Sequence, residues 1–222
     1  MTEDLVIVGG GGFGRETLDV VEAINAGGPR FRILGVVDDH PSAVNLERLT
    51  ARSYRHLGGI DEALENYSAV RYLIGIGSPG ARARLAARLD GAGWGAATAI
   101  HPSAVLGSQT VVAEGVLICA GARVSTNVHL GRHVHLNPSV TVGHDTKIGD
   151  CTSVNPGAII SGDVRIAPGV LIGAGAIVLQ GLDVGARAIV GAGACVTKPV
   201  PPETVAIGVP AVSSPRRPPA DP

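Results

Sequence analysis

The sequence predicts two successive folds: an α/β N-terminal domain of a small Rossmann-like type over residues 1–97, and an all-β parallel β-helix over residues 98–212. Two observations carry this prediction. Strand-like and helix-like segments alternate in the first part, and an aliphatic residue recurs at every sixth position in the second. The last residues, 213–222 (SSPRRPPADP), have little apolar content, and we expect them to form a disordered tail.

Composition argues against several classes of partner and compartment. The formal net charge is −1, so there is no basic surplus to bind nucleic acid. The three cysteines have no Cys-x-x-Cys spacing, which indicates a reducing compartment, without disulfides or a cysteine zinc site. No basic leader precedes the first apolar stretch, and no apolar run approaches the roughly 20 residues that span a bilayer. We therefore expect a cytoplasmic protein without membrane insertion.

In the N-terminal part, three apolar segments have the pattern of strands: residues 5–8, 33–37 and 72–76. Helical patterns follow the first and the third of these strands, over residues 15–24 and 79–89. Strands that alternate with helices form parallel sheets. About 90 residues suffice for roughly half of a doubly wound fold, so we expect a small sheet.

A glycine-rich loop at residues 9–14 (GGGGFG) joins the first strand to the first helix and fits the pattern G-x-G-x-x-G. Backbone N–H groups of such a loop can bind phosphate, and Asp38, 24 residues beyond Gly14, could bind a ribose hydroxyl. A tight turn, a phosphate-binding loop and an NAD site all stay open as interpretations. The short sheet, with no dehydrogenase domain after it, argues against NAD.

The second part has Ile, Leu or Val at every sixth position, without exception. The seventeen positions are Ile100, Leu106, Val112, Ile118, Val124, Leu130, Leu136, Val142, Ile148, Val154, Ile160, Ile166, Ile172, Val178, Val184, Val190 and Val196. This hexapeptide repeat is typical of a parallel β-helix, in which three hexads form one triangular coil. Each repeat residue is expected to point inward and to stack on its counterpart in the next coil, about 4.8 Å away.

The interior of such a prism is too narrow for aromatic side chains, which agrees with their share of 3%. Its outer surface is rigid and offers regular ledges. No insertion interrupts the six-residue register. We therefore expect the ledges themselves, the N-terminal domain or a neighbouring subunit to enclose any substrate.

The main candidate for chemistry is His144, which Asp145 follows directly. His144 lies two positions after the repeat residue Val142, so we place it at a corner, facing outward. A nearby carboxylate orients an imidazole and raises its basicity, which suits a general base. An ordinary surface histidine is the alternative from spacing alone, and the two side chains can meet only around a turn.

Three further histidines, His129, His133 and His135, could hold a metal ion between subunits, as in β-helix carbonic anhydrases. No two histidines of the chain are 18 residues apart, so none stack on neighbouring coils. Solvated or interface histidines are therefore the favoured interpretation, and we expect no metal. At the domain junction, His101 is expected to make a structural hydrogen bond.

Six segments in this order resemble one known family. They are residues 6–16 (VIVGGGGFGRE), 35–39 (GVVDD), 74–77 (IGIG), 100–104 (IHPSA), 142–149 (VGHDTKIG) and 206–211 (AIGVPA). Together they resemble the sialic-acid O-acetyltransferase and UDP-4-amino-sugar N-acetyltransferase group (NeuD/PglD-type) of the left-handed β-helix acyltransferases. The hexapeptide repeat alone identifies only the superfamily, whereas the glycine loop, the Asp-Asp pair and the His-Asp pair are far more specific.

The resemblance implies a left-handed β-helix, a homotrimer and an active site between neighbouring subunits. It implies that His144 is the general base and that the carboxylate of Asp145 raises its basicity. It also assigns ligand contacts. Those of the nucleotide-sugar substrate fall on Gly11, Gly12, Phe13, Asp38, Asp39 and Gly77, with Asn137 near the acceptor amine, and those of acetyl-CoA fall near Ser153, Gly162, Ala174 and Ala192.

Three positions depart from the best-known amino-sugar enzymes of this group. Asp145 replaces a longer Glu, Phe13 stands where those enzymes have a His, and Ser153 stands where some have a His that contacts CoA. The changes at Phe13 and Ser153 bear on the identity of the acceptor sugar rather than on acyl transfer.

The expected activity is direct acetyl transfer from acetyl-CoA to a nucleotide-linked amino sugar or related sugar in surface-glycan biosynthesis. A backbone N–H on the next coil would stabilise the oxyanion. One alternative is O-acetylation of sialic acid or of another polysaccharide precursor. The others are a metal enzyme of the carbonic anhydrase type and a non-catalytic nucleotide-sugar sensor.

Overall fold

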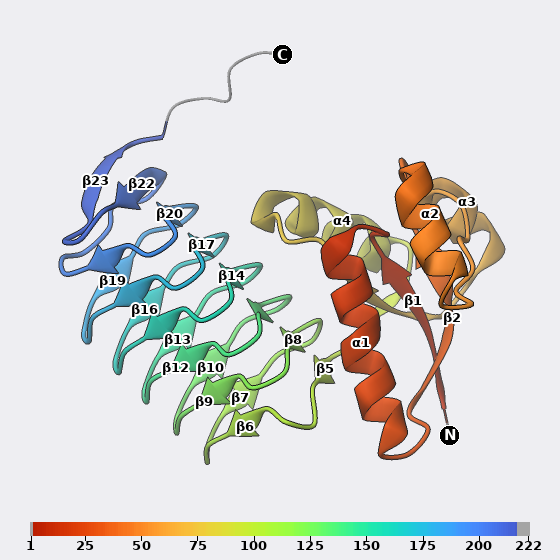
Figure 1. Ribbon diagram of the computed structural model, residues 1–222, viewed down its shortest axis with the longest axis horizontal. Coiled ribbons are helices and arrows are strands. Elements are labelled where there is room, and N and C mark those ends of the chain that lie inside the picture. The colour runs from red at the N-terminus through yellow and green to blue at the C-terminus, as the bar shows by residue number, and fades with distance from the viewer. Residues whose placement is uncertain (1, 217–222) are drawn as a thin grey trace.

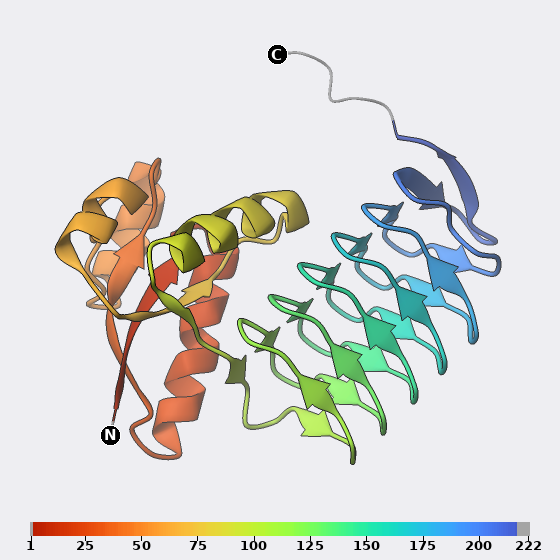
Figure 2. The same cartoon turned by 180° about the vertical axis from the view of Figure 1, so that it is seen from behind.

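The computed structural model describes residues 2–216 and contains a four-stranded parallel sheet followed by a parallel β-helix (Figures 1 and 2). The N-terminal elements are β1 (Glu3–Val8), α1 (Gly12–Ala26), β2 (Phe31–Val37), α2 (Ala43–Thr50), α3 (Ile60–Asn66), β3 (Arg71–Ile74), α4 (Pro79–Gly91) and β4 (Gly95–Ala96). The strands lie in the order β2-β1-β3-β4, and all neighbouring pairs are parallel. The α/β part of the predicted fold is thus confirmed.

Strand β1 serves both faces of this sheet, because successive side chains of a strand point in opposite directions. Leu5 and Ile7 pack with Leu18 of α1 in one buried cluster. Val6 and Val8 belong to a second buried cluster, to which α3 and α4 contribute. The small sheet is therefore covered on both sides, as parallel sheets usually are.

The turn from β1 into α1 brings backbone segments into direct contact. A Cβ atom at Gly14 would overlap with the carbonyl oxygen of Gly9, so only glycine fits there. Gly75, just after β3, lies against the same turn: a Cβ there would come within 2.5 Å of the Gly14 Cα. The glycine loop and the segment after β3 thus form one edge at the carboxyl ends of the strands, where open parallel sheets bind ligands.

The β-helix begins with seventeen two-residue strands, each six residues after the previous one. They are β5 (Ala99–Ile100), β6 (Val105–Leu106), β7 (Val111–Val112), β8 (Leu117–Ile118), β9 (Arg123–Val124), β10 (His129–Leu130), β11 (His135–Leu136), β12 (Thr141–Val142), β13 (Lys147–Ile148), β14 (Ser153–Val154), β15 (Ile159–Ile160), β16 (Arg165–Ile166), β17 (Leu171–Ile172), β18 (Ile177–Val178), β19 (Asp183–Val184), β20 (Ile189–Val190) and β21 (Cys195–Val196).

These strands stack into three parallel sheets that form the sides of the prism. We name them the domain-facing sheet (β5, β8, β11, β14, β17 and β20), the second sheet (β6, β9, β12, β15, β18 and β21) and the third sheet (β7, β10, β13, β16 and β19). The chain visits them in this order, so each coil has three corners.

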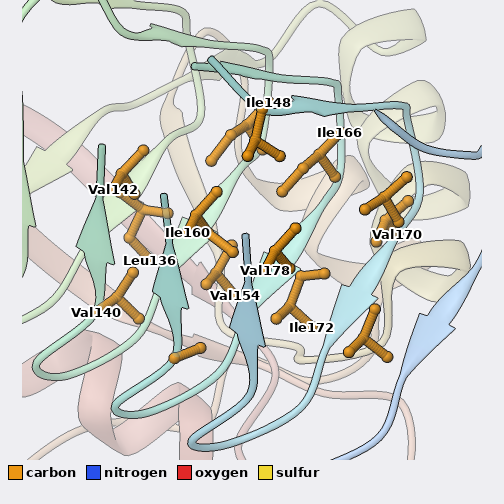
Figure 3. Packing of buried hydrophobic residues seen from close by; sticks show 14 of the residues in the cluster. Leu136, Val140, Val142, Ile148, Val154, Ile160, Ile166, Val170, Ile172 and Val178 are labelled. Atoms are coloured by element: carbon orange, nitrogen blue, oxygen red, sulfur yellow. The ribbon is translucent and has the colours of Figure 1, made fainter. Parts of the chain in front are cut away.

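The second residue of each strand forms the core of the prism (Figure 3). Leu136, Val154 and Ile172, for example, follow one another on the domain-facing sheet, each one coil beyond the last. From Ile118 to Val196, every repeat residue is at most 3% exposed. Burying one such side chain contributes about 1.5–3 kcal/mol, so the repeat residues supply most of the stability of the rod. The predicted hexapeptide β-helix is confirmed.

The C-terminal end adds two longer strands to the domain-facing sheet. Strand β22 (Thr204–Ile207) pairs with β20 in parallel, and β23 (Val212–Pro215) pairs with β22 in antiparallel fashion. The sequence predicts a disordered tail from residue 213, whereas the structure places residues 213–215 in β23. Residues 217–222 of that predicted tail lie outside the described residues.

The N-terminal domain packs on the first coils of the domain-facing sheet (Figures 1 and 2). Ala99 and Leu117 of the β-helix share a buried cluster with Leu18 of α1. At the junction itself, the predicted hydrogen bond of His101 is local, because its Nδ1 accepts the Ser103 N–H at 3.0 Å. None of the helices in the described residues is both long and apolar enough to cross a bilayer.

Candidate active site

His144 lies at the corner between β12 and β13, where the chain passes from the second sheet to the third. Its Nδ1 atom is 2.7 Å from Oδ2 of Asp145. Neighbouring residues can meet in this way because Asp145 has a left-handed backbone conformation, with φ of 62°. The side chains of His144 and Asp145 are 62% and 51% exposed, so the pair lies open on the surface of the single chain.

Asn127, one coil earlier, supports the carboxylate of Asp145. Its Nδ2 donates to Asp145 Oδ1 at 3.1 Å. The hydrogen bonds from His144 and then Asn127 lower the pKa of Asp145 below its ordinary value. Asp145 therefore stays ionised near neutral pH, favours a proton on Nδ1 of His144, and leaves Nε2 as the free basic atom.

Gly162, on the next coil, lies directly against the His144 ring. A Cβ atom at this position would come within 2.6 Å of both Cε1 and Nε2 of the imidazole. Within residues 2–216, the N–H of Gly162 donates to no protein acceptor, so it is free to bind a ligand oxygen. A basic nitrogen next to a free backbone donor is the combination that acyl transfer requires.

The glycine loop has open space on its outer side. A Cβ at Gly11 would meet no atom within 4 Å, and one at Gly12 would meet only the end of the Arg15 side chain, at 4.0 Å. Both residues lie at the N-terminus of α1, where free N–H groups and the helix dipole favour an anion. This edge of the domain can therefore accommodate a phosphorylated ligand.

Asp38 and Asp39 hold the backbone around this edge. Asp38 accepts the Gly10 N–H through Oδ2 at 2.7 Å and the His40 N–H through Oδ1 at 3.0 Å. Asp39 accepts the N–H of Ile60, the first residue of α3, at 2.7 Å. The sequence suggests only ligand contacts for these two carboxylates. It does not indicate that they accept hydrogen bonds from backbone N–H groups of the neighbouring loops.

Phe13 and Asn137 lie close to the same coil of the β-helix. The Phe13 ring packs against His135 of β11, with the ring centroids 5.1 Å apart. Asn137 follows this strand, is 6% exposed, and donates through Nδ2 to Oδ1 of Asn155 on the next coil at 3.0 Å. The structure thus brings these two predicted substrate residues together at the domain-facing side of the prism.

Ser153, predicted to contact the coenzyme, instead lies in the interface between the two domains. It is 0% exposed, and its Oγ donates to the carbonyl oxygen of Gly77 at 2.8 Å. The same Oγ accepts a hydrogen bond from Arg82 Nη2 at 2.9 Å. Ser153 therefore presents no surface to a coenzyme in this chain, because its hydroxyl is fully used between Gly77 and Arg82.

The remaining predicted coenzyme positions lie on two different corners. Ala174 and Ala192 are exposed and stack on successive coils after the domain-facing sheet, where the Gly193 N–H donates to the Ala174 carbonyl at 2.8 Å. Gly162 lies at the corner that follows the second sheet, together with His144. A ligand that contacts both sets must either span the second sheet or lie between two chains.

The structure also contains a groove of about 620 Å³ that the sequence does not predict. It lies between the first turns of α4 and the later coils of the domain-facing sheet, and Leu171, Ile189, Arg84 and Arg187 line it. His144 and the other predicted site residues are not part of its lining. The groove is therefore separate from the His144–Asp145 pair and from the glycine loop.

The three clustered histidines do not come together at one point. His129 is exposed on the third sheet, whereas His133 and His135 are buried against the N-terminal domain. Tyr72 stacks on His133 with centroids 5.8 Å apart, and burial lowers the pKa of His133 to about 4. Across residues 2–216, no three His, Cys, Asp or Glu side chains are placed to share a metal ion. The alternative of a metal site thus finds no support in this cluster.

Within one chain, His144 and the glycine loop lie on different sides of the prism. The corner of His144 joins the second and third sheets, whereas the N-terminal domain covers the domain-facing sheet. In a triangular cross-section, that corner is opposite the domain-facing sheet. A single chain therefore does not bring the imidazole next to the glycine loop.

Known proteins resemble this chain in sequence and in fold. Residues 4–89 match the PglD N-terminal domain. The GDP-perosamine N-acetyltransferase of Escherichia coli O157:H7 is 40% identical over 50 residues, which span only 22% of this chain and 23% of that protein.

Solved structures match over nearly the whole length. PerB from Caulobacter crescentus, in complex with CoA and GDP-perosamine, has a TM-score of 0.84 and 29% identity, with 96% of this chain and 98% of that chain covered. A variant of the Caulobacter perosamine N-acetyltransferase with one His replaced by Asn also contains both ligands. The acetyltransferase domain of PglB from Neisseria gonorrhoeae FA1090, in complex with acetyl coenzyme A, has a TM-score of 0.82 and 25% identity, with 96% and 100% covered.

Fold and site together define a left-handed β-helix protein of the hexapeptide-repeat class that carries a PglD-type N-terminal domain. The chain has an exposed His144–Asp145 pair at a corner of the prism and a glycine loop with open space on the opposite side. Residues 4–89 thus match a PglD-type domain, and nearly the whole chain is similar in fold to the Caulobacter and Neisseria acetyltransferases, in line with the resemblance that the sequence motifs indicate.

Proposed function

We propose that this chain transfers the acetyl group of acetyl-CoA to the amino group of a nucleotide-linked amino sugar, with His144 as general base. The observation that carries this proposal is the His144–Asp145 pair, with the backbone of Gly162 beside the free Nε2 atom. The ligands of the relatives support it, since PerB binds CoA and GDP-perosamine and the PglB domain binds acetyl coenzyme A.

The reaction is a direct transfer without a covalent enzyme intermediate. The sugar amine attacks the thioester carbonyl carbon while Nε2 of His144 takes one proton from the amine. The carbonyl oxygen gains negative charge, which the Gly162 N–H stabilises. When the intermediate collapses, the C–S bond breaks, and the CoA thiolate takes the proton back from the imidazolium. Asp145, ionised throughout, keeps the ring oriented and stabilises its charged form.

The working unit of this reaction is a homotrimer in which one chain supplies His144 and its neighbour supplies the glycine loop. The separation of these two features within one chain supports this arrangement, because the site is incomplete without a second copy. The second sheet also carries exposed aliphatic side chains, Val105 and Ile159, which are 55% and 41% exposed. Apolar groups in such a position favour contact with further copies of the chain.

In this arrangement the nucleotide lies along the loop at residues 9–14 and Gly77, and Asn137 lies near the acceptor amine. Acetyl-CoA extends past Gly162 of one chain and Ala174 and Ala192 of the next. The compartment is the cytoplasm, in agreement with cysteines that are all free thiols.

A thiol-release assay tests the proposal. The purified protein is incubated with acetyl-CoA and, in turn, with UDP-, dTDP- and GDP-linked amino sugars, and free CoA is measured. We expect one of these sugars to release CoA and to gain one acetyl group on nitrogen. The matched control is the same nucleotide sugar with a hydroxyl in place of the amine. Release with the hydroxyl form alone would favour O-acetylation, and no release with any sugar would contradict the proposed transfer.

A further inference from the structure

Arg82 is a buried cation without a carboxylate partner. It lies in the first turn of α4, is 0% exposed, and forms no ion pair within residues 2–216. All of its donors are nevertheless used. Nε donates to the carbonyl of His133, Nη1 to those of Ile76 and Gly77, and Nη2 to the carbonyl of Cys151 and to Ser153 Oγ, at distances from 2.7 to 3.3 Å.

These five bonds join segments that are far apart in the sequence. Ile76 and Gly77 follow β3 in the N-terminal domain, whereas His133 and Cys151 occupy the same corner on two successive coils of the β-helix. Ser153 completes the network, since its Oγ accepts a hydrogen bond from Arg82 Nη2 and donates one to the carbonyl oxygen of Gly77 at 2.8 Å. A single guanidinium thus connects the segment after β3 to two coils of the rod.

The segment after β3 is in turn packed on the glycine loop. A Cβ at Gly9 would lie 2.7 Å from Cγ1 of Ile76, and one at Gly75 would lie 2.5 Å from the Gly14 Cα. Neither segment can move far without the other, because there is no free volume between them. The position of Arg82 therefore determines where the glycine loop stands relative to the β-helix.

Stability alone does not call for an arginine here. Removing a guanidinium from water is costly, and well-packed apolar residues often replace buried charges without loss of stability. Burial lowers the pKa of Arg82 to about 10, so the side chain still carries its charge at neutral pH. The planar guanidinium of Arg82 donates hydrogen bonds in several fixed directions at once, which an apolar side chain cannot do.

We propose that Arg82 is a positioning residue that, together with Ser153, fixes the nucleotide-binding edge of the N-terminal domain against the β-helix wall bearing Asn137. This inference rests on the proposed function. It assigns Ser153 to the placement of the nucleotide sugar rather than to the coenzyme. Acetyl-CoA, bound along the outer corners, does not depend on this junction.

The test compares Arg82→Met, Arg82→Lys and Ser153→Ala with the wild-type protein. Arg88→Met is the matched control, since Arg88 lies on the same helix and pairs with Asp61 at the surface. We expect Arg82→Met to raise the KM for the nucleotide sugar about tenfold, with the KM for acetyl-CoA within about twofold of wild type. Arg82→Lys and Ser153→Ala should fall in between, because each keeps part of the network. An unchanged sugar KM, or a parallel rise of both KM values, would overturn the inference.

Hydrogen exchange distinguishes this inference from the proposed function and does not require turnover. The amides of residues 9–14 and 75–78 should exchange at least about tenfold faster in Arg82→Met, while those of the later coils keep their protection. If Arg82→Met does not fold, Ser153→Ala decides by the same measurement. Unchanged exchange in these two segments would refute the inference even in an active enzyme. Absent activity in the wild-type protein would instead refute the proposed acetyl transfer.

Discussion

The imidazole of His144 lies against the backbone of Gly162, which is one coil further along the rod, so closely that a methyl group on Gly162 would occupy the space of the ring. In the proposed reaction, Gly162 therefore has two roles: its N–H binds the thioester oxygen, and its lack of a side chain leaves space for the His144 ring. Only the smallest side chain allows both, because a Cβ atom would come within 2.6 Å of Nε2.

Gly162→Ala should lower kcat about 100-fold, since displacing a base by about 1 Å typically costs this much. The effect is measured as kcat at saturating concentrations of both substrates. The matched control is Gly91→Ala at the end of α4, where a Cβ meets no atom within 4 Å, and this variant should retain wild-type turnover. Equal turnover in the two variants would mean that the position of the His144 ring does not matter for the reaction.

His144→Ala should reduce kcat by about 1,000-fold, in the middle of the range for the loss of a general base. The KM for acetyl-CoA should stay within about twofold, because the proposed role of His144 is to move a proton from the amine to the thiolate rather than to bind the coenzyme. His129→Ala, which removes an exposed histidine of the third sheet, is the control. Near-normal turnover in His144→Ala would exclude this residue as the base.

Mixed trimers test whether the site combines two chains. Gly11→Leu should block the nucleotide edge without disturbing the fold, because a Cβ there meets open space and Gly11 has an ordinary φ of −71°. Trimers of Gly11→Leu alone and of His144→Ala alone should be inactive. When both chains are refolded together, about one interface in four pairs an intact His144 with an intact loop, so about a quarter of the wild-type activity should return. A mixture as inactive as its components would place both groups of the site in one chain.

The domain junction should weaken in acid because of His133. Burial lowers its pKa from the ordinary 6.5 to about 4. Between these two values the unfolded chain binds a proton that the folded chain does not, so the free energy of unfolding should fall by about 1.4 kcal/mol per pH unit as the pH decreases. Above the unfolded value both states are neutral, and this contribution is fully present.

The measurement is the melting temperature of wild type and His133→Asn from about pH 7 to about pH 5. Asn is chosen because His133 has a φ of 55°, which Asn tolerates. The acid-induced decrease should be smaller in His133→Asn, and the buried His135 should account for the part that remains. The exposed His129→Ala serves as control and should follow wild type. Identical slopes in His133→Asn and wild type would show that His133 does not titrate in this interface.

The six-residue repeat predicts the β-helix residue by residue, because every strand of the prism needs one inward aliphatic side chain and this requirement recurs every six positions. Each of the seventeen positions from Ile100 to Val196 is the second residue of a strand. The glycine loop and three of the four strands of the N-terminal sheet are predicted equally well, and their boundaries shift by only a few residues. Helices α2 and α3 are not predicted, because both are short and owe their positions to tertiary contacts such as that of Asp39 with α3.

The site is predicted less completely, because its remaining features depend on contacts between distant segments. The left-handed conformation of Asp145 lets this shorter carboxylate reach His144, which spacing cannot reveal. Nor does spacing indicate that Arg82 meets Ser153, 71 residues away. The sequence leaves solvated and interface positions open for His133 and His135, and only the docked N-terminal domain shows that both are buried.

Between residues 99 and 196 the coils follow one another without a single insertion, so this stretch provides no flap that could fold over His144. Many enzymes switch between open and closed states by moving such a cover. In the proposed trimer a neighbouring copy of the protein covers His144, so the activity should depend on protein concentration. The specific rate should be constant at high protein concentration and decline steeply where the copies part, although each separated copy keeps its fold.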